Sequence, residues 1–151
     1  MPIFTQSGTK EYDFWLLDGQ PDFSVIPANT IKEIDGPLPI RLQHGNRFYG
    51  SQHILKKHGK WVTKSESTGC VATLLHRKLS QPGKLHVAED GKHALAMQVA
   101  PAAFIVLRRP ANQHFLTVVT MYFRQSPADG EILGRYLGYE WAVSPYVAPR
   151  W

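Results

Sequence analysis

Three basic side chains are spaced so that they could act together in one short segment. His53 and Lys57 are four residues apart, so they would share one face of a helix, and His58 would lie one step round. An imidazole exchanges a proton near neutral pH because its unperturbed pKa is about 6.5. The segment could therefore carry acid–base chemistry. A helix-capping or solvated surface role would explain the same residues.

Other common catalytic signatures are absent from the sequence. His53 and His58 are five residues apart with no glutamate between them, unlike the His-Glu-X-X-His zinc site. The single cysteine, Cys70, excludes a disulfide framework and a thiolate-rich zinc site. There is no Gly-X-X-X-X-Gly-Lys phosphate loop and no Gly-X-Ser-X-Gly nucleophile turn. We therefore expect neither a metal nor a cofactor, and we interpret Cys70 as an inert core residue.

The charge is strongly segregated along the chain. The net charge is +5 over 151 residues, but residues 1–36 carry −4, residues 37–124 carry +10 and residues 125–151 carry −1. All seven histidines also lie in the middle segment. A surface with this charge would attract a polyanion, most commonly RNA or DNA. A solvated basic face that only maintains solubility is the alternative.

Two helices are expected to position these side chains. Ser51 can cap a helix of about two turns, which Gly59 would end in a left-handed conformation. A second helix is expected from about Glu66 to Leu79. Its apolar residues recur at helical period and form one stripe: Cys70, Val71, Leu74, Leu75 and Leu79.

The rest of the chain predicts an antiparallel sheet. Four runs separated by turn residues read as strands: 85–87, 94–99, 103–107 and 115–123. The predicted fold is therefore α+β, with an N-terminal arm and helices packed on an antiparallel sheet of about four strands. We divide this single domain into an acidic arm or short strands (1–36), a basic core (37–126), and a C-terminal helix over 129–137 with an irregular tail (127–151).

The last long strand should present two different faces. Alternation places Phe115, Thr117, Val119, Met121 and Phe123 on one face, which is the more apolar and is expected to meet the helices. The opposite face becomes polar toward its end, at Thr120, Tyr122 and Arg124. A hydroxyl, a phenol and a guanidinium would thus lie in a row.

The order of these elements resembles a known group of enzymes. Leu42 to His58 has the form Leu-X-His-Gly, then Tyr-Gly-X-X-His-Ile-X-X-X-His, and a helix and a sheet with a Thr-Val-Val-Thr strand follow. This arrangement is similar to the barnase–EndoU–colicin–RelE-like ribonucleases, particularly the branch found in phages and bacterial toxin systems. The resemblance spans roughly residues 40–125.

The resemblance implies RNA cleavage without a metal, in which a ribose 2′-hydroxyl attacks the neighbouring phosphate. Histidine suits the base and the acid of that reaction, and lysine or arginine suits the crowded phosphate. The implied catalytic residues are His53, His58 and Lys57 from the helix, with Arg108, Thr120 and Tyr122 from the strands. Further basic side chains are expected to bind the RNA: Lys56, Lys60, Arg41, Arg47, Arg109 and Arg124.

The same resemblance implies the partners of the protein. The RNA would be tRNA or mRNA, and a toxin would require an acidic immunity protein or antitoxin to cover the basic surface. No apolar run approaches the ~20 residues of a membrane helix, and the first residues show no secretory pattern, so we expect a protein of the cytoplasm of the producing or a target cell. The alternative is a phage or bacterial module that binds nucleic acid or protein without catalysis. A transferase of ADP-ribose is a weaker interpretation, because Glu89, Glu131 and Glu140 lie in no defined motif.

Overall fold

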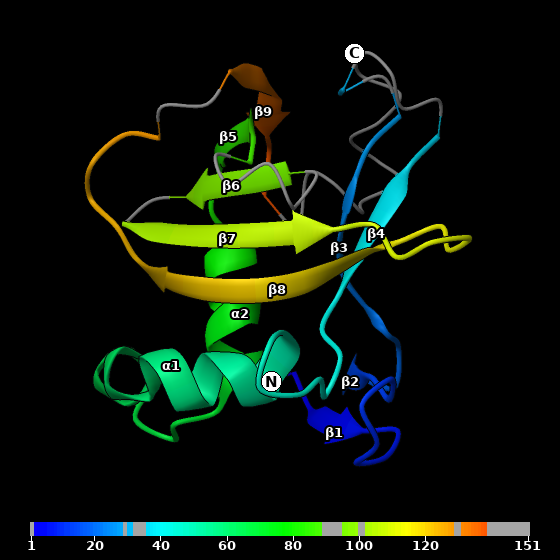
Figure 1. The fold of residues 1–151 in the computed structure, drawn as a ribbon, viewed down its shortest axis with the longest axis vertical. Helices are drawn as coiled ribbons and strands as arrows, with labels where there is room; N and C mark the ends of the chain where they lie inside the picture. The colour runs from blue at the N-terminus through cyan, green and yellow to red at the C-terminus, as the bar shows by residue number, and fades with distance from the viewer. Residues whose placement is uncertain are drawn as a thin grey trace.

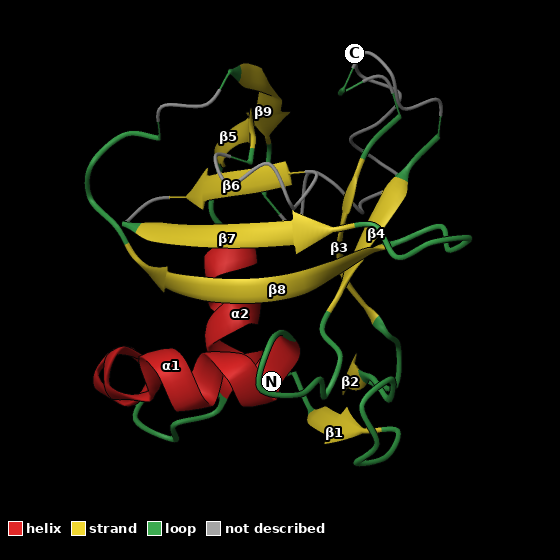
Figure 2. Cartoon of the chain, viewed as in Figure 1, coloured by secondary structure: helices red, strands yellow, loops and turns green. Residues whose placement is uncertain are grey.

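In the residues that the structure describes, a seven-stranded sheet and two helices form the body of the protein, and a two-stranded sheet lies beside them (Figures 1 and 2). The computed structural model describes residues 2–28, 30–31, 36–88, 95–99, 102–128 and 131–138. The helices are α1 (Gly50–Ser65) and α2 (Val71–Leu79). The strands are β1 (Phe4–Gln6), β2 (Trp15–Leu17), β3 (Asp22–Ile26), β4 (Leu38–Arg41), β5 (Gly83–Val87), β6 (Leu95–Val99), β7 (Ala103–Arg108), β8 (Leu116–Phe123) and β9 (Ile132–Tyr136).

The main sheet has the order β3-β4-β8-β7-β6-β5-β9 and is antiparallel except where β4 pairs with β8. The α+β class and the largely antiparallel sheet are confirmed, but the expected number of about four strands is wrong. The four runs correspond to β5–β8, and β3, β4 and β9 extend the sheet at its two ends. Short strands such as these are stabilised by their neighbours and carry a weak signal in the sequence.

Residues 1–36, expected to form an arm or short strands, contribute three strands. β1 and β2 pair with each other, and β3 pairs with β4 at the end of the main sheet. Phe23 on β3 is fully buried in the main core. The acidic segment therefore packs as part of the fold in its described residues.

The first helix is longer than expected. It continues past Gly59 to Ser65, and His58 alone interrupts it with φ −127° and ψ 21°. Gly59 does not adopt the left-handed conformation that would have ended the helix, whereas Gly69 does, with φ +71°. Because α1 extends to Ser65, residues 66–70 form the connection between the helices. Helix α2 therefore begins at Val71 and not near Glu66.

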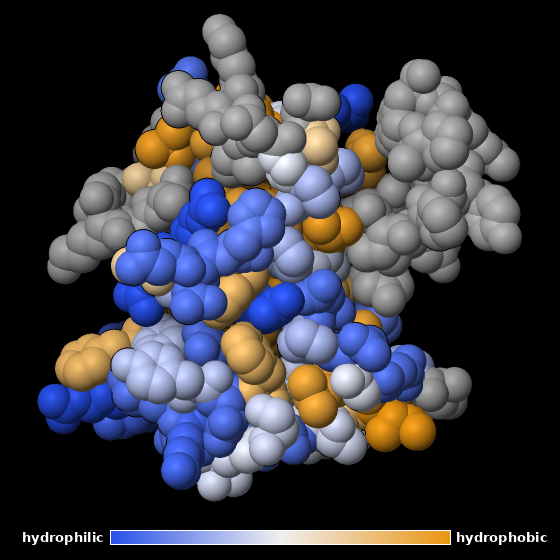
Figure 3. All heavy atoms as spheres, turned by 90° about the vertical axis from the view of Figure 1, so that its right-hand side faces the viewer, coloured by the Kyte–Doolittle hydropathy of each residue, from blue (hydrophilic) through white to orange (hydrophobic). Residues whose placement is uncertain are grey.

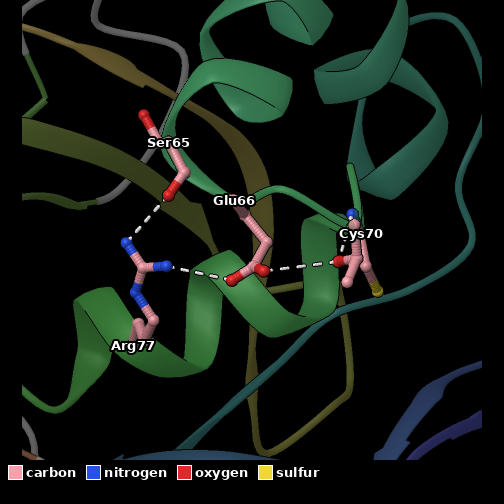
Figure 4. A network of polar contacts seen from close by, with 5 residues as sticks. Ser65, Glu66, Cys70 and Arg77 are labelled. Atoms are coloured by element: carbon pink, nitrogen blue, oxygen red, sulfur yellow. Dashed lines mark hydrogen bonds and ion pairs between the residues drawn. The ribbon is translucent and has the colours of Figure 1, made fainter.

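A polar network holds this connection in place (Figure 4). The Arg77 guanidinium donates to the Glu66 carboxylate at 2.9 Å and to the Ser65 carbonyl at 3.0 Å. Thr68 donates its hydroxyl to Glu66 and accepts the backbone N–H of Cys70, the residue before α2. The network fixes the end of α1 against the last turn of α2. The network also pairs the carboxylate of Glu66 with Arg77. Among the described residues of the basic segment 37–124, Glu66 is the acidic one.

The C-terminal helix expected over 129–137 is wrong, because the described residues there form strand β9. β9 pairs with the edge of β5 that β6 does not cover, and so supplies hydrogen-bond partners to backbone groups that would otherwise be exposed at that edge. Tyr136 is 1% exposed, and its hydroxyl donates to the Leu79 carbonyl and lies 2.6 Å from the Ser24 hydroxyl. The pairing and this buried contact override the local helical pattern. The expected irregular tail beyond residue 138 lies outside the described residues.

Apolar side chains cover both faces of the sheet. The larger core lies between one face of the sheet and α2. It includes Phe23 from β3 and Leu74 and Leu75 from α2. A smaller cluster covers the other face and contains Tyr49, Ala96, Phe104, Val106 and Val119, with Tyr122 and Ala128 packed against it. Helix α1 packs along β8, and α2 packs against α1 and β3 and lies behind β7 and β8 in the view of Figure 1.

The expected division of faces on β8 is wrong. The main core takes Leu116, Val118 and Met121, while Val119 and Tyr122 belong to the smaller cluster. The register shifts where Val106 pairs with Thr120 and Leu107 pairs with Val118, which leaves Val119 as an extra residue. Such a β-bulge exchanges the faces of all later residues, so simple alternation fails beyond it.

Candidate active site

Three of the predicted catalytic side chains meet where α1 passes the end of β8. The ring of His58 stacks on the ring of Tyr122, with 5.3 Å between centroids and 28° between planes. The ring of His53 lies edge-on to His58 at 6.3 Å. His53 and His58 come from α1, whereas Tyr122 is more than sixty residues further along the chain. All three side chains are partly exposed, so a ligand can reach them.

The first turn of α1 is anchored from several sides. Gly50 has φ +80°, and a Cβ there would lie 2.7 Å from the Gln43 carbonyl oxygen and 2.9 Å from the Gly45 Cα. The hydroxyl of Ser51 was expected to cap the helix, but it donates to the His44 carbonyl and accepts from the indole of Trp15, each at 3.0 Å. The glycines let two backbone segments approach closely, and this fixes the position from which His53 projects.

The tautomer of His53 follows from its hydrogen bond. Its Nδ1 lies 2.8 Å from the carbonyl oxygen of Arg47. A carbonyl oxygen can only accept, so Nδ1 carries a proton and donates. Nε2 is then the nitrogen that gains or loses a proton. An imidazole oriented in this way is suited to proton transfer at one defined atom.

His58 is placed in a different electrostatic environment. Partial burial lowers its pKa below the ordinary value of 6.5, and the neighbouring His53 and Lys57 lower the pKa further. Its imidazole is therefore neutral at neutral pH and can accept a proton. The non-helical backbone at His58 coincides with the position where its ring turns onto Tyr122.

Tyr122 belongs to a chain of ring contacts that continues across the sheet. Phe104 on β7 lies directly opposite it, with 5.5 Å between ring centroids. The guanidinium of Arg124 lies 4.8 Å from the centre of the Phe104 ring. Phe104 was missed in the sequence. Simple antiparallel pairing across the turn would not have found it, because the register of Arg108 with Thr117 would place Phe104 opposite Met121, and the shift at Val119 brings it opposite Tyr122.

The other two predicted catalytic residues from the strands, Thr120 and Arg108, lie on the same sheet face as Tyr122. Thr120 pairs with Val106, and its hydroxyl oxygen is buried without a hydrogen-bond partner in the part of the chain that the structure describes. Arg108 extends from the end of β7 over the ring of Tyr49 at 5.3 Å. Tyr49 was also missed, although its place directly before Gly50 and the histidine helix was a usable signal.

Some of the remaining basic side chains are exposed to solvent, and others have hydrogen-bond or ion-pair partners within the protein. Lys56, Lys57 and Lys60 are exposed on α1, and Lys57 is close enough to His58 to affect its pKa. Arg47 is exposed and lies 4.7 Å from the centre of the Phe48 ring. Of these cations, Lys57 is the one whose charge acts on His58, and the others lie exposed on α1 and its preceding loop.

Three arginines expected to bind RNA already have partners in the structure. Arg41 pairs with Asp22 at 2.7 Å. Arg109 donates to the Gln113 carbonyl in the β7–β8 turn at 2.9 Å, and Arg124 donates to backbone oxygens at Ser126 and Pro127. Figure 3 shows the side of the molecule that lies at the right in Figure 1, where hydrophilic side chains form a band across the middle.

Neither a metal centre nor a membrane helix is found among the described residues. No group of three or more His, Cys, Asp or Glu side chains is arranged to hold a metal ion there, and Cys70 is a free, partly buried thiol packed against the core. No helix of the described chain is long and apolar enough to cross a bilayer. Glu89, His93 and Glu140 lie outside the described residues.

Comparisons with protein-family models, with curated proteins and with solved structures found no match to this chain. The function must therefore be argued from the site itself.

Proposed function

We propose that the protein is a small metal-independent ribonuclease, which cleaves RNA by attack of a 2′-hydroxyl on the adjacent phosphate. The observation that carries the proposal is the pair of histidines on α1, one with a fixed Nδ1–H tautomer and one with a lowered pKa. Two imidazoles in different environments are what a reaction with one acid and one base requires. The resemblance of residues 40–125 to toxin-type ribonucleases points in the same direction.

His58 is the general base in this proposal. Because burial lowers its pKa, the imidazole is neutral at pH 7 and can accept the proton of the 2′-hydroxyl. The 2′-oxygen then forms a bond to phosphorus. The stack with Tyr122 holds the plane of the imidazole during this transfer.

His53 is the general acid. When it is protonated, its Nε2 donates to the leaving 5′-oxygen as the bond between phosphorus and that oxygen breaks. The hydrogen bond from Nδ1 to the Arg47 carbonyl keeps the ring oriented. The products are a 2′,3′-cyclic phosphate and a 5′-hydroxyl, and both protons are accounted for.

Cations near the pair would stabilise the phosphate, which gains charge in the transition state. Lys57 is exposed beside His58, and Arg108 lies on the same sheet face. Removal of one such electrostatic contact commonly lowers the rate by about 10²–10³-fold in enzymes. We expect Lys57→Ala and Arg108→Ala each to lower the cleavage rate by that factor or by less, because water reaches both side chains and weakens their electrostatic contribution.

The test is to incubate the purified full chain with total RNA in EDTA. We expect cleavage by the wild type, and at least a hundredfold slower cleavage by His53→Ala and by His58→Ala, in line with the ~10²–10⁴-fold contribution of one acid or base. His114→Ala is the matched control, because His114 is an exposed histidine in the β7–β8 turn. Wild-type rates in both site variants would refute the assignment of the two histidines.

A module that binds RNA without cleaving it is the second candidate. One observation favours it, which is the run of rings from His53 through His58 and Tyr122 to Phe104 beside basic side chains. Aromatic rings on a sheet, flanked by cations, are a common way to bind single-stranded nucleic acid by stacking. In the same assay this candidate predicts salt-sensitive retention of RNA by the wild type and by both histidine variants, with no cleavage.

An acidic immunity protein or antitoxin remains the partner that this proposal implies. It would cover the exposed lysines of α1, which are Lys56, Lys57 and Lys60. Association of oppositely charged proteins is fast at low salt and slows as salt increases.

A further inference from the structure

A separate cleft opens on the same side of the sheet, next to the first turn of α1. Its volume is about 390 Å³, within the range of about 300–1,000 Å³ typical of small-molecule sites. Aromatic rings and a few polar groups line it, notably Tyr12, Phe14, Gln43, Tyr49, Arg108 and Phe115. Tyr12, Phe14 and Gln43 come from the part of the fold that β1 to β4 build, and none of them was singled out in the sequence.

The aromatic walls of the cleft are held rigidly. Phe14 and Phe115 meet edge to face, with 5.5 Å between centroids and 74° between planes. The guanidinium of Arg41 lies 5.5 Å from the centre of the Phe14 ring and 4.9 Å from that of Phe115, and its ion pair with Asp22 keeps it there. Rigid rings lose little conformational freedom when a planar ligand stacks on them.

Polar groups of the cleft have defined hydrogen-bonding roles. The amide nitrogen of Gln43 donates to the Tyr12 carbonyl at 3.2 Å, so the amide oxygen is the acceptor that this side chain can offer a ligand. The hydroxyl of Tyr49 donates to the Glu11 carboxylate at 3.2 Å. Arg108, over the Tyr49 ring, supplies the donors and the positive charge. The cleft thus combines stacking surfaces, one acceptor and one cation.

The cleft is also close to the two histidines along the chain. Tyr49 lines it and directly precedes α1, and His53 lies four residues later, about 6 Å further along a helix axis. Arg47, whose carbonyl holds His53, lies two residues before Tyr49. An RNA strand whose phosphate lies at the two histidines could therefore place a neighbouring base in the cleft.

We propose that this cleft binds one unstacked nucleobase that carries an amino group, next to the phosphate at His53 and His58. The role as a substrate subsite rests on the proposed ribonuclease function. The base would stack on the exposed ring of Tyr12 and the partly exposed ring of Phe14, its amino group would donate to the Gln43 amide oxygen, and Arg108 would face the sugar–phosphate. Adenine, guanine and cytosine have such an amino group, and uracil does not.

The test is an NMR titration of the full chain with each of the four nucleoside 5′-monophosphates, which the proposed reaction cannot cleave. We expect the amide signals of Tyr49, Arg108 and Gln113 to shift with AMP, GMP and CMP. UMP should bind about five- to tenfold more weakly, as expected for one lost hydrogen bond. Equal affinity for all four, or shifts confined to residues outside the cleft, would overturn the proposal.

Two variants provide the matched comparison. Tyr12 is 72% exposed, so Tyr12→Ala should fold normally, and it should weaken binding of the three amino-bearing nucleotides. Phe48 is 66% exposed and does not line the cleft, so Phe48→Ala should bind them like the wild type. Equal binding by the two variants would show that the nucleotides do not occupy this cleft.

The same experiments separate this proposal from the ribonuclease function. The double variant His53→Ala/His58→Ala should lose cleavage and keep nucleotide binding at the cleft. Wild-type cleavage without shifts at the cleft would overturn the base-binding proposal alone. Shifts at the cleft without any cleavage of RNA would overturn the ribonuclease proposal and leave a base-binding site.

Discussion

Two glycines near the two ends of the histidine segment should respond in opposite ways to alanine. Gly50 precedes the histidines with φ +80°, a conformation that costs an L-residue about 1–2 kcal/mol. The added Cβ would lie 2.7 Å from the Gln43 carbonyl oxygen and 2.9 Å from the Gly45 Cα, both of which are backbone atoms that cannot turn aside. We expect Gly50→Ala to reduce the free energy of unfolding by more than the conformational cost alone.

Gly59 is the matched control, because it lies inside α1 with an ordinary φ. The nearest atom to its added Cβ would be Cδ1 of Leu55, at 3.9 Å, which is an ordinary contact. Alanine is favoured over glycine within a helix by about 0.5–1 kcal/mol, so Gly59→Ala should increase stability.

The assay is thermal denaturation of the three proteins followed by circular dichroism. In a chain of this size each kcal/mol shifts Tm by about 2–4 °C, so Gly50→Ala should melt at least ~4 °C below the wild type and Gly59→Ala ~1–4 °C above it. Gly50→Ala should also cleave RNA more slowly, because the first turn positions His53. An unchanged Tm for Gly50→Ala, or an equal fall for Gly59→Ala, would refute this account of the helix start.

Three further outcomes follow from the structure. Tyr136→Phe removes the buried hydroxyl that contacts Ser24 and the Leu79 carbonyl, and urea denaturation should show a loss of about 1–3 kcal/mol. The pKa of His58 is lower in the folded than in the unfolded chain, so the unfolded chain binds more protons between that pKa and 6.5. Stability should therefore fall as pH falls through this window, with a smaller fall in His58→Ala; an identical pH dependence in the two proteins would contradict the shift. Tyr122→Phe keeps the ring that stacks on His58 and should retain RNA binding, whereas Tyr122→Ala should weaken it in a filter-binding assay.

The sequence predicted the class of the fold and most of its longer elements, because their signals are local. The apolar stripe of α2 and the runs that became β5 to β8 are readable from periodicity alone. The short strands β3, β4 and β9 are not, since pairing with distant neighbours stabilises them. β9 shows this most clearly, because its formation depends on the free edge of β5 and on Ser24, more than a hundred residues away.

The candidate site was predicted in part for similar reasons. His53 and His58 could be paired from their spacing on α1, and Tyr122 could be chosen as a polar position near the end of a strand. The contact between the rings of His58 and Tyr122 depends on the bulge at Val119, which the local sequence does not predict. The aromatic cleft was missed because Phe14 and Phe115 meet only after β3 and β4 have joined the sheet.

The most direct test of the ribonuclease proposal uses one synthetic oligonucleotide that the protein cleaves, made with and without a 2′-hydroxyl at the scissile position. The reaction is followed in EDTA, and the ends of the products are identified by mass spectrometry. The proposal predicts a 2′,3′-cyclic phosphate and a 5′-hydroxyl from the ribose substrate and no cleavage at the deoxyribose position. Cleavage of both substrates at that position would contradict attack by the 2′-hydroxyl, and with it the roles proposed for His53 and His58.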